Sequence, residues 1–204
     1  MGWDTLAPLD SINRAIASLR EHGIEAMLVQ TGGEARDKVL SIIPPGDEVM
    51  NMTSRTLTSI GLDKDVLESG RYQATKNTLA AMDSKTQTLE KQRLGAAPPW
   101  AIGSVHAVTE DGSVMFASNT GSQLAAYAYG ALKVVWVVGA QKIVADKEEG
   151  TDRIYQWCLP HERERALAAY GPGTTTAVNK MLVINGEKVK GRLTMVLVNE
   201  VIGI

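Results

Sequence analysis

Cysteine and histidine are scarce in this sequence. Cysteine occurs once in 204 residues, at Cys158, and the three histidines show no spacing typical of a metal site. A single cysteine excludes an internal disulfide and any zinc or iron–sulfur site built from cysteines of this chain alone. We therefore identify no cofactor and no metal, and we expect the reducing environment of the cytoplasm.

An excess of charge of one sign and long apolar runs are also lacking. The formal net charge is −2, so the chain has no basic field with which to attract nucleic acid. No stretch approaches the roughly 20 apolar residues of a membrane span, and Met1–Asp4 does not open a secretory signal. We expect neither nucleic acid nor a membrane as a partner.

What is present is an ordinary globular composition, with 44% hydrophobic and 22% charged residues. Short apolar runs bounded by turn residues alternate with stretches of helical periodicity, which predicts an α/β fold. We expect one α/β domain over residues 1–204, a three-layer α/β/α Rossmann-like sandwich with a mostly parallel sheet. The unbroken apolar run Leu132–Val138 is the predicted central strand.

Local signals predict the second half of the chain in more detail. The Asp111-Gly112 turn lies between β-compatible runs at Ala101–Val108 and Ser113–Ala117, which favours a hairpin. Two further strands, Met181–Ile184 and Leu193–Val198, are expected at a sheet edge.

Three helices are predicted from helix-forming residues and from the breakers that separate them. One covers Asn77–Leu94 and ends at a Gly- and Pro-containing loop. The other two, Asp146–Leu159 and His161–Tyr170, are expected to be separated by Pro160.

The segment that points most directly to a ligand is Asn119, Thr120, Gly121 and Ser122, where a strand should give way to a helix. Free backbone N–H groups and the positive end of a helix would converge there, so an anion can bind. The alternative is that Asn119 or Thr120 only caps its helix, since the segment has the spacing of neither a dinucleotide fingerprint nor a P-loop.

Lys142 and the turn Thr53–Arg55 are the other candidates for an anion site. Lys142 follows the predicted central strand, near the edge at which ligands of open α/β sheets collect, and Arg55 and neighbouring hydroxyls can bind an anion. The alternatives are a solvated surface lysine and a helix cap.

Glu110 is the main candidate for catalysis. It can act as a general base or as a nucleophile towards an acyl group, or it can be a solvated carboxylate in a turn. His106 is more simply explained as a structural histidine in an apolar strand, His161 as exposed, and Cys158 as buried packing.

The sequence resembles the LUD domain family, which includes lactate-utilisation protein C. The resemblance rests on Asn51-Met52-Thr53, on Ala107–Ser113 running to Asn119–Ser122, and on Val134–Val144 with its Gly139-Ala140-Gln141-Lys142-Ile143-Val144 ending. It implies the fold shared by ribose-5-phosphate isomerase, glucosamine-6-phosphate deaminase and CoA transferases. It also implies a part in L-lactate oxidation alongside iron–sulfur partner proteins.

The chain departs from that family pattern in three places. Gln141 stands where an asparagine is expected, and Met50-Asn51-Met52-Thr53 replaces a Gly-Ser-Met-Thr-like turn. Cys158 is alone where some relatives carry several cysteines, so any cluster belongs to a partner. The loops are therefore open to a different ligand.

Three functions follow from these observations. The first is a LUD-domain protein that binds a small anionic metabolite, a carboxylate or a phosphate ester, in organic-acid metabolism. The second is a CoA transferase that uses Glu110 as acyl acceptor, or a sugar-phosphate isomerase that uses Glu110 or Asp111 as proton carrier. The third is a non-catalytic subunit that docks on an iron–sulfur partner or forms a homo-oligomer. The sequence does not decide whether the chain is an enzyme.

Overall fold

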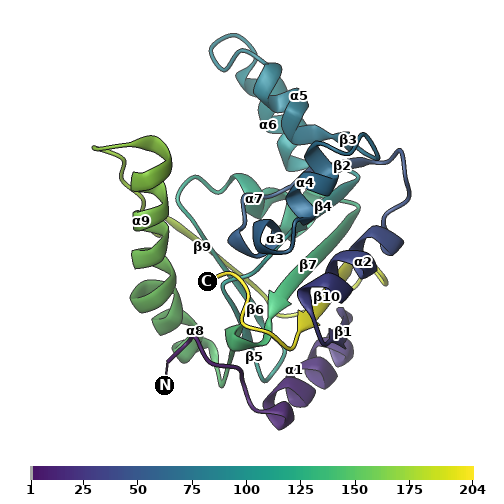
Figure 1. Ribbon diagram of the computed structural model, residues 1–204, viewed down its shortest axis with the longest axis vertical. Coiled ribbons are helices and arrows are strands. Elements are labelled where there is room, and N and C mark those ends of the chain that lie inside the picture. Colours follow the sequence, from purple (N-terminus) through teal and green to yellow (C-terminus); the bar gives the residue numbers. More distant parts are fainter. Residues whose placement is uncertain (1) are drawn as a thin grey trace.

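A parallel sheet forms the centre of the molecule, described for residues 2–204 by a computed structural model (Figure 1). Its six strands run in the order β1-β10-β7-β4-β2-β3, and every neighbouring pair is parallel. The strands are β1 (Glu25–Val29), β2 (Glu48–Asn51), β3 (Gln73–Ala74), β4 (Trp100–Gly103), β7 (Lys133–Gly139) and β10 (Leu193–Val198). The predicted α/β class with a mostly parallel sheet is confirmed.

Strand β7 lies between β10 and β4 and alternates its side chains between two hydrophobic cores. Val134 and Trp136 belong to the core that contains α1 (Leu9–Glu21), whereas Val135 and Val137 belong to the core that contains α2 (Gly32–Ile42). Because successive residues of a strand point to opposite faces, a run buried on both faces must be apolar throughout. The prediction of this run as the central strand is confirmed.

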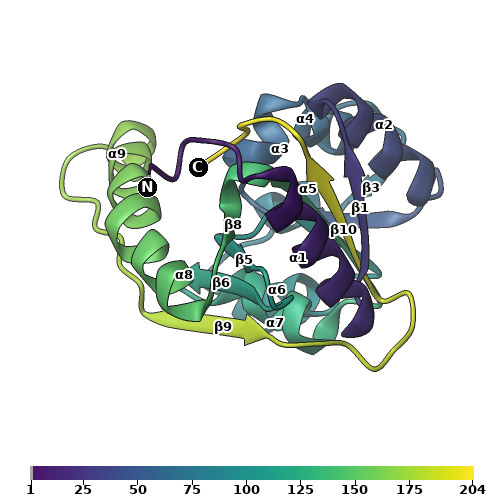
Figure 2. The same ribbon diagram turned by 90° about the horizontal axis from the view of Figure 1, so that it is seen from below.

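Helices cover the two faces of the sheet unequally. On one face lie α2, α3 (Arg55–Ser59) and α4 (Leu62–Leu67), and α1 packs on the other (Figures 1 and 2). The face with α1 is also covered by a second sheet that the sequence did not predict. This sheet has the order β8-β5-β6-β9, with β5 (Ala107–Thr109), β6 (Val114–Ser118), β8 (Ile143–Val144) and β9 (Lys180–Ile184).

The predicted hairpin forms, but its first strand does not extend over the whole predicted run. Strands β5 and β6 pair antiparallel, and Gly112 has a φ of 83° in the turn between them. The first run, Ala101–Val108, is not one strand, because β4 ends in the large sheet and β5 begins in the small one. Hydrophobic alternation does not reveal that a chain changes sheets, since both halves of the run are buried.

The two last strands have different positions. Strand β9 is at the edge of the small sheet, as predicted, but β10 lies between β1 and β7, so the prediction of an edge position for Leu193–Val198 is wrong. All six residues of β10 are buried. A strand that is buried along its whole length fits an interior position better than an edge.

The prediction of one continuous helix over Asn77–Leu94 is also wrong. The chain forms α5 (Thr75–Ala81) and α6 (Thr88–Ala96), which stand off the body as a two-helix arm (Figure 1). In the turn between them the Asp83 side chain accepts a hydrogen bond from the backbone N–H of Lys85. Such local bonds from aspartate compete with the helical backbone pattern.

The helices on either side of Pro160 are continuous. α8 (Lys147–Arg153) passes through the π-helical turn η3 (Ile154–Cys158) into α9 (Leu159–Tyr170), with Pro160 in the first turn of α9. The predicted separation at Pro160 is therefore wrong. The widened π turn before Pro160 lets the chain continue without the N–H that proline lacks.

Two shorter helical turns follow strands of the fold. α7 (Ser122–Ala125) leads into the π turn η1 (Ala126–Gly130), and the 3₁₀ turn η2 (Ala140–Lys142) follows β7. Within residues 2–204, every helix is too short or too polar to cross a bilayer.

Candidate functional site

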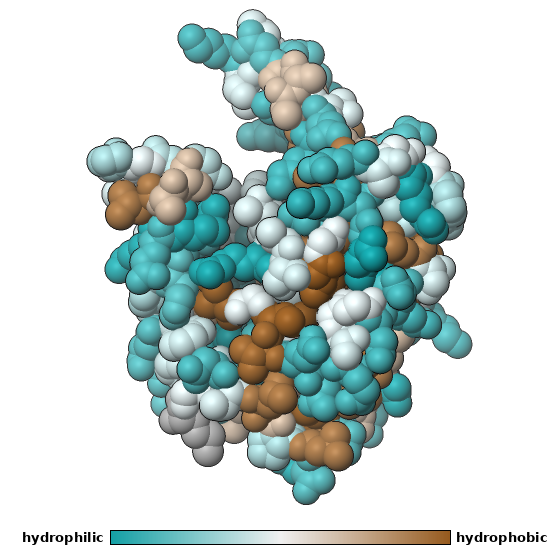
Figure 3. All heavy atoms as spheres, in the orientation of Figure 1, coloured by the Kyte–Doolittle hydropathy of each residue, from teal (hydrophilic) through white to brown (hydrophobic). Residues whose placement is uncertain are grey.

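A cavity of about 450 Å³ lies where several strands end. Its lining comes from the turn after β2, from residues 104–106 after β4, from the end of β6, from Lys142 after β7, and from α9 with residues 174–178. The carboxyl ends of parallel strands meet at one edge of an α/β sheet, which is where ligands of such folds collect. In the space-filling view the molecule is hollowed between α9 and the two-helix arm (Figure 3). We call this cavity the site cavity.

Lys142 is the most unusual side chain of the site cavity. It is 3% exposed, and its ammonium donates only to neutral oxygens: Thr56 Oγ1 at 3.0 Å, Ser104 Oγ at 3.1 Å and the Val105 carbonyl at 3.3 Å. Among residues 2–204, no carboxylate lies within ion-pair distance of it. Burial, and secondarily the Arg153 guanidinium, lowers the pKa of Lys142 to about 7. The alternative of a solvated surface lysine is thereby removed.

A second buried cation, Arg153, stands behind the cavity wall. Its side chain is completely buried, and Nη1 donates to the His106 carbonyl and, at 3.0 Å, to Cys158 Sγ. Nε and Nη2 of Arg153 have no hydrogen-bond partner in the described chain. Two positive groups are therefore buried close together without an acidic partner, which is costly in a region of low dielectric.

Cys158 lines the site cavity but is not activated. Burial raises the pKa of its thiol, and the lowering effects of Arg153 and Lys142 are smaller. The thiol is thus held in its protonated, weakly nucleophilic form. The predicted role of Cys158 as buried packing agrees with this position.

His106 also lines the site cavity, so its position is more than structural. Its Nδ1 accepts a hydrogen bond of 3.2 Å from the Ala117 backbone N–H. Burial and the nearby Lys142 and Arg153 lower the pKa of His106 to about 3, which keeps the ring neutral. A neutral ring that accepts at Nδ1 carries its proton on Nε2, which makes His106 a fixed hydrogen-bond donor.

Asn51, at the end of β2, is a third polar group on the inner wall. It is 1% exposed, and its Oδ1 accepts no hydrogen bond within residues 2–204. Buried amides are nearly always hydrogen-bonded. The free atom is a buried acceptor, so a donor such as an alcohol group could satisfy it, whereas a carboxylate or phosphate oxygen could not.

The outer part of the site cavity carries more cations. Lys76, from the base of the arm, donates to Thr53 Oγ1 at 3.2 Å, and Arg55 is exposed on the same turn. Burial lowers the pKa of Lys76, the carboxylate of Asp63 opposes this shift, and the positive charge of Arg165 on α9 adds to it. Arg165 is itself paired with Glu162, at 2.6 Å and 2.7 Å.

The segment Asn119–Ser122 contributes side chains rather than free backbone groups. Asn119, Thr120 and Ser122 line the site cavity, whereas Gly121 does not. The N–H of Gly121 donates to Ser118 Oγ at 2.8 Å and that of Ser122 donates to Thr120 Oγ1 at 3.4 Å. These N–H groups are occupied locally, so anion binding through them stays a prediction without geometric support.

Glu110 lies apart from the site cavity. It is in the turn between β5 and β6 and forms a two-pronged ion pair with Arg14 of α1, at 2.7 Å and 2.9 Å. The hydrogen bond from Arg14 lowers the pKa of Glu110, which is the opposite of what a general base near neutral pH needs. The structure therefore brings Thr53, Arg55 and Lys142 together but leaves Glu110 outside.

Sequence reasoning missed Asn51, Lys76 and Arg165 as residues of this site. Lys76 and Arg165 come from helices whose polar faces look like ordinary solvated surfaces in the sequence. Gln141, the departure from the family pattern, does not line the site cavity and donates to the Ile202 carbonyl at 2.8 Å. Among residues 2–204 no group of three His, Cys, Asp or Glu side chains is placed to hold a metal ion.

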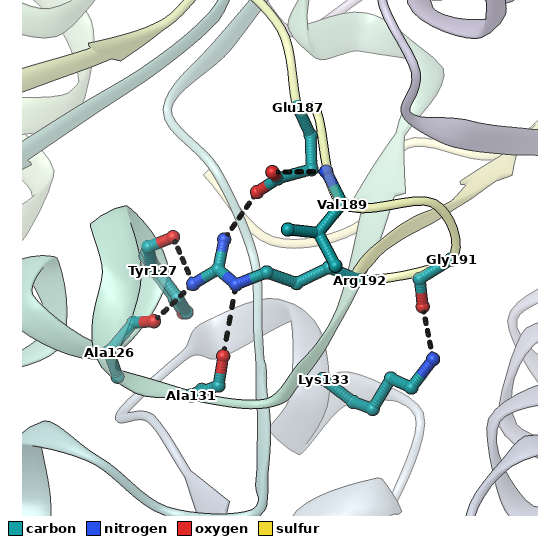
Figure 4. Close-up of polar contacts among 8 residues, drawn as sticks. All are labelled: Ala126, Tyr127, Ala131, Lys133, Glu187, Val189, Gly191 and Arg192. Carbon is teal, nitrogen blue, oxygen red and sulfur yellow. Dashed lines mark hydrogen bonds and ion pairs between the residues drawn. The ribbon is translucent and has the colours of Figure 1, made fainter.

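A different buried cation, Arg192, is fully partnered. Its guanidinium pairs with Glu187 at 2.7 Å and donates to the carbonyls of Ala126, Tyr127 and Ala131 at 3.0–3.1 Å (Figure 4). Figure 4 shows these acceptors surrounding it from the η1 turn and the segment before β10. This group fastens η1 to the chain before β10, and it does not line the site cavity.

Comparisons with known proteins agree with the fold. The chain is similar to a DUF162 family protein from Deinococcus radiodurans, with a TM-score of 0.58 and 11% identity over 95% of this chain and 99% of that one. At this identity the likeness concerns the fold. No curated protein matches the chain. The profile of the LUD domain matches residues 12–201, so the chain belongs to the LUD domain family.

Proposed function

We propose that this LUD-domain protein binds a small anionic metabolite, a carboxylate or a phosphate ester, in the site cavity. The observation that carries the proposal is Lys142, a buried amine on the cavity wall that contacts neutral oxygens alone. Keeping its ammonium form there without a counter-ion costs several kcal/mol. A bound anion supplies that counter-ion, and Arg153 behind the wall adds to the attraction.

Binding of such an anion is coupled to protonation of Lys142. The pKa of Lys142 is about 7 without a ligand, and an anion favours the charged form. The protein should therefore take up a proton as it binds near neutral pH. Affinity should be highest below pH 7 and should fall up to tenfold per pH unit above it.

A panel of lactate, pyruvate, sugar phosphates and CoA esters tests the proposal by calorimetry and thermal shift. We expect at least one of these anions to bind the wild-type protein and to bind Lys142→Met at least tenfold more weakly. Lys38→Met, which removes an exposed lysine of α2, is the matched control and should bind normally. The proposal fails if the panel does not bind, or binds both variants equally.

We further propose that the bound metabolite belongs to lactate or related organic-acid utilisation, with iron–sulfur proteins as partners. This role rests on the family and not on a contact in the molecule. Affinity capture from the native host should recover proteins with iron–sulfur clusters. Capture of no such protein under anaerobic conditions counts against the role, while leaving the anion site untouched.

The two other functions have less support. The enzymes that would use Glu110 need that carboxylate beside the substrate, whereas it is paired with Arg14 outside the site cavity. Assembly into a homo-oligomer stays a prediction, and the two-helix arm is the surface to examine. Its helix α6 buries no residue against the body, and its visible face is mostly hydrophilic (Figure 3). Sedimentation velocity measures the assembly state directly.

A further inference from the structure

The three hydrogen-bond partners of Lys142 suit a neutral amine as well as an ammonium. Nζ lies 3.0 Å from Thr56 Oγ1, 3.1 Å from Ser104 Oγ and 3.3 Å from the Val105 carbonyl. An ammonium donates to all three, whereas a neutral amine has two N–H donors and one lone pair. Because two of the partners are hydroxyls, either can turn and donate to that lone pair. Lys142 can therefore lose its proton and still keep three partners.

This amine is fixed on the wall of the site cavity. Lys142 ends the η2 turn after β7, while Thr56 lies on α3 and Ser104 follows β4, so three separate elements hold Nζ in place. The side chain is 3% exposed, and the part of it that is not covered faces a space of about 450 Å³. A reacting group held in one position beside a bound molecule is what a covalent step requires.

The charges around Lys142 also favour the neutral amine. No carboxylate of the described residues 2–204 lies within ion-pair distance of it, and His106 on the same cavity is neutral. Burial, and secondarily Arg153, lowers the pKa of Lys142 to about 7 against an opposing effect of Cys158. Roughly half of such an amine is unprotonated at pH 7, whereas an ordinary lysine is almost entirely charged. Neutral lysine amines form imines with carbonyl groups.

The same position selects the kind of carbonyl compound. An imine at neutral pH carries a positive charge, and burying that charge without a counter-ion is costly. A simple aldehyde or ketone would leave the charge unpaired beside the buried Arg153. A 2-oxo acid has its carboxylate on the carbon next to the carbonyl group. One small ligand of this class therefore brings both the electrophilic carbon and the counter-ion to Nζ.

We propose that Lys142 condenses with the carbonyl group of a 2-oxo acid and holds it in the site cavity as an imine. This inference rests on the proposed anion site and goes further, because it gives Lys142 a covalent role.

The condensation needs no oxidant, reductant or second substrate. The lone pair of Nζ forms a bond to the carbonyl carbon, and the π electrons of the carbonyl group move to its oxygen. One amine proton then passes to that oxygen, and the hydroxyls of Thr56 and Ser104, both within hydrogen-bond distance of Nζ, can relay it. The nitrogen pair next expels this hydroxyl group, which leaves as water with one proton from solvent. The product is a cationic imine beside the ligand's own carboxylate.

Reduction with sodium borohydride tests the proposal, because it converts an imine into a stable secondary amine. The wild-type protein is treated near pH 7 with pyruvate or 2-oxoglutarate, and the modified lysines are identified by mass spectrometry of its peptides. We expect Lys142 to be labelled at least about tenfold faster than Lys38, an exposed lysine of α2 in the same molecule. The labelling ratio of Lys142 to Lys38 should also be at least about tenfold higher with pyruvate than with acetone, a ketone without a carboxylate.

The variants show whether the label depends on this amine. Lys142→Met should lose the fast labelling, and Lys38→Met should keep it. Lys142→Gln repeats the test if the methionine variant does not fold, and the peptide map of the wild-type protein requires no variant.

Two results overturn the inference: labelling of Lys142 no faster than that of Lys38, and a labelling ratio as high with acetone as with pyruvate. Absence of the adduct together with Lys142-dependent binding of lactate would overturn the imine and leave the proposed function standing. Absence of the adduct together with no binding by any anion of the panel would overturn both.

Discussion

Arg192 and Lys142 are both buried cations, but their surroundings differ completely. Arg192 is 6% exposed, and it pairs with Glu187 and three backbone carbonyls (Figure 4). Lys142 is 3% exposed and contacts three neutral oxygens, and no carboxylate of the described residues 2–204 pairs with it. Arg192 has all its partners within the chain, whereas Lys142 has no counter-ion among residues 2–204.

This difference separates a structural charge from a binding charge. A buried ion with all its partners is destabilising to break, because removal of one partner leaves the others unsatisfied. A buried ion without a counter-ion is itself a cost to folding, and such groups persist mainly where they serve a site. Burial alone does not distinguish the two cases, but the partners do.

The largest effect should follow the removal of the complete cation. Arg192→Met leaves Glu187 and three carbonyls without their donor in the interior, so the free energy of unfolding should fall by ~3–5 kcal/mol. Urea denaturation measures this loss. A fall of less than ~1 kcal/mol would show that Arg192 is not the structural group described here.

Lys142→Met should behave in the opposite way. The variant removes a charge that folding must bury, so its unfolding free energy at pH 7 should be unchanged or higher, while anion binding is lost. Denaturation of both variants under the same conditions makes the comparison. If the free energy of unfolding fell as much for Lys142→Met as for Arg192→Met, the two cations would both be structural and this account would be wrong.

The pH dependence of stability gives a further test that Lys142 is a buried cation without a counter-ion. The pKa of Lys142 is about 7 when folded and near 10.5 when unfolded, so between these values the unfolded chain binds more protons. This group therefore makes the protein more stable as pH rises through that window, by up to ~1.4 kcal/mol per pH unit. The difference between wild type and Lys142→Met, measured by denaturation from pH 7 upward, isolates the slope. Parallel curves for the two proteins contradict the buried-cation account.

The smallest effect is expected at Glu110. Its pair with Arg14 is partly exposed, since the side chains are 26% and 56% accessible, so Glu110→Gln should cost ~1 kcal/mol or less. Anion binding should be unchanged, because Glu110 does not line the site cavity. Calorimetry with the best-binding anion tests this. Weakened binding in a folded variant would show that Glu110 contributes to the site.

The sequence predicted the parts of the fold that local pattern determines. The continuous apolar run of β7 indicated a central strand, and Asp111-Gly112 indicated the turn between β5 and β6. The small sheet and the interior position of β10 were missed because they depend on which strands pair across long separations. Pairing of that kind leaves no signal in a single apolar run.

The sequence predicted where the candidate site lies, but it did not predict the burial and the hydrogen-bond partners of the side chains in it. Position after a central strand correctly placed Lys142 at the strand ends, but sequence could not show that it is buried without an acidic partner. The segment Asn119–Ser122 lines the site cavity in part, yet the N–H groups of Gly121 and Ser122 are bonded to nearby hydroxyls. The partners of Lys142 are distant from it in sequence, so only the folded chain shows them.

The titration of Lys142 itself tests the central claim most directly. NMR of ¹³C-labelled lysine side chains, with Lys142→Met used to assign the signal, reports the protonation of this amine as a function of pH. We expect a midpoint near 7 in the free protein and a higher midpoint when an anion of the panel is bound. A midpoint near 10 in the free protein, unmoved by the ligand, would show that Lys142 is an ordinary solvated lysine.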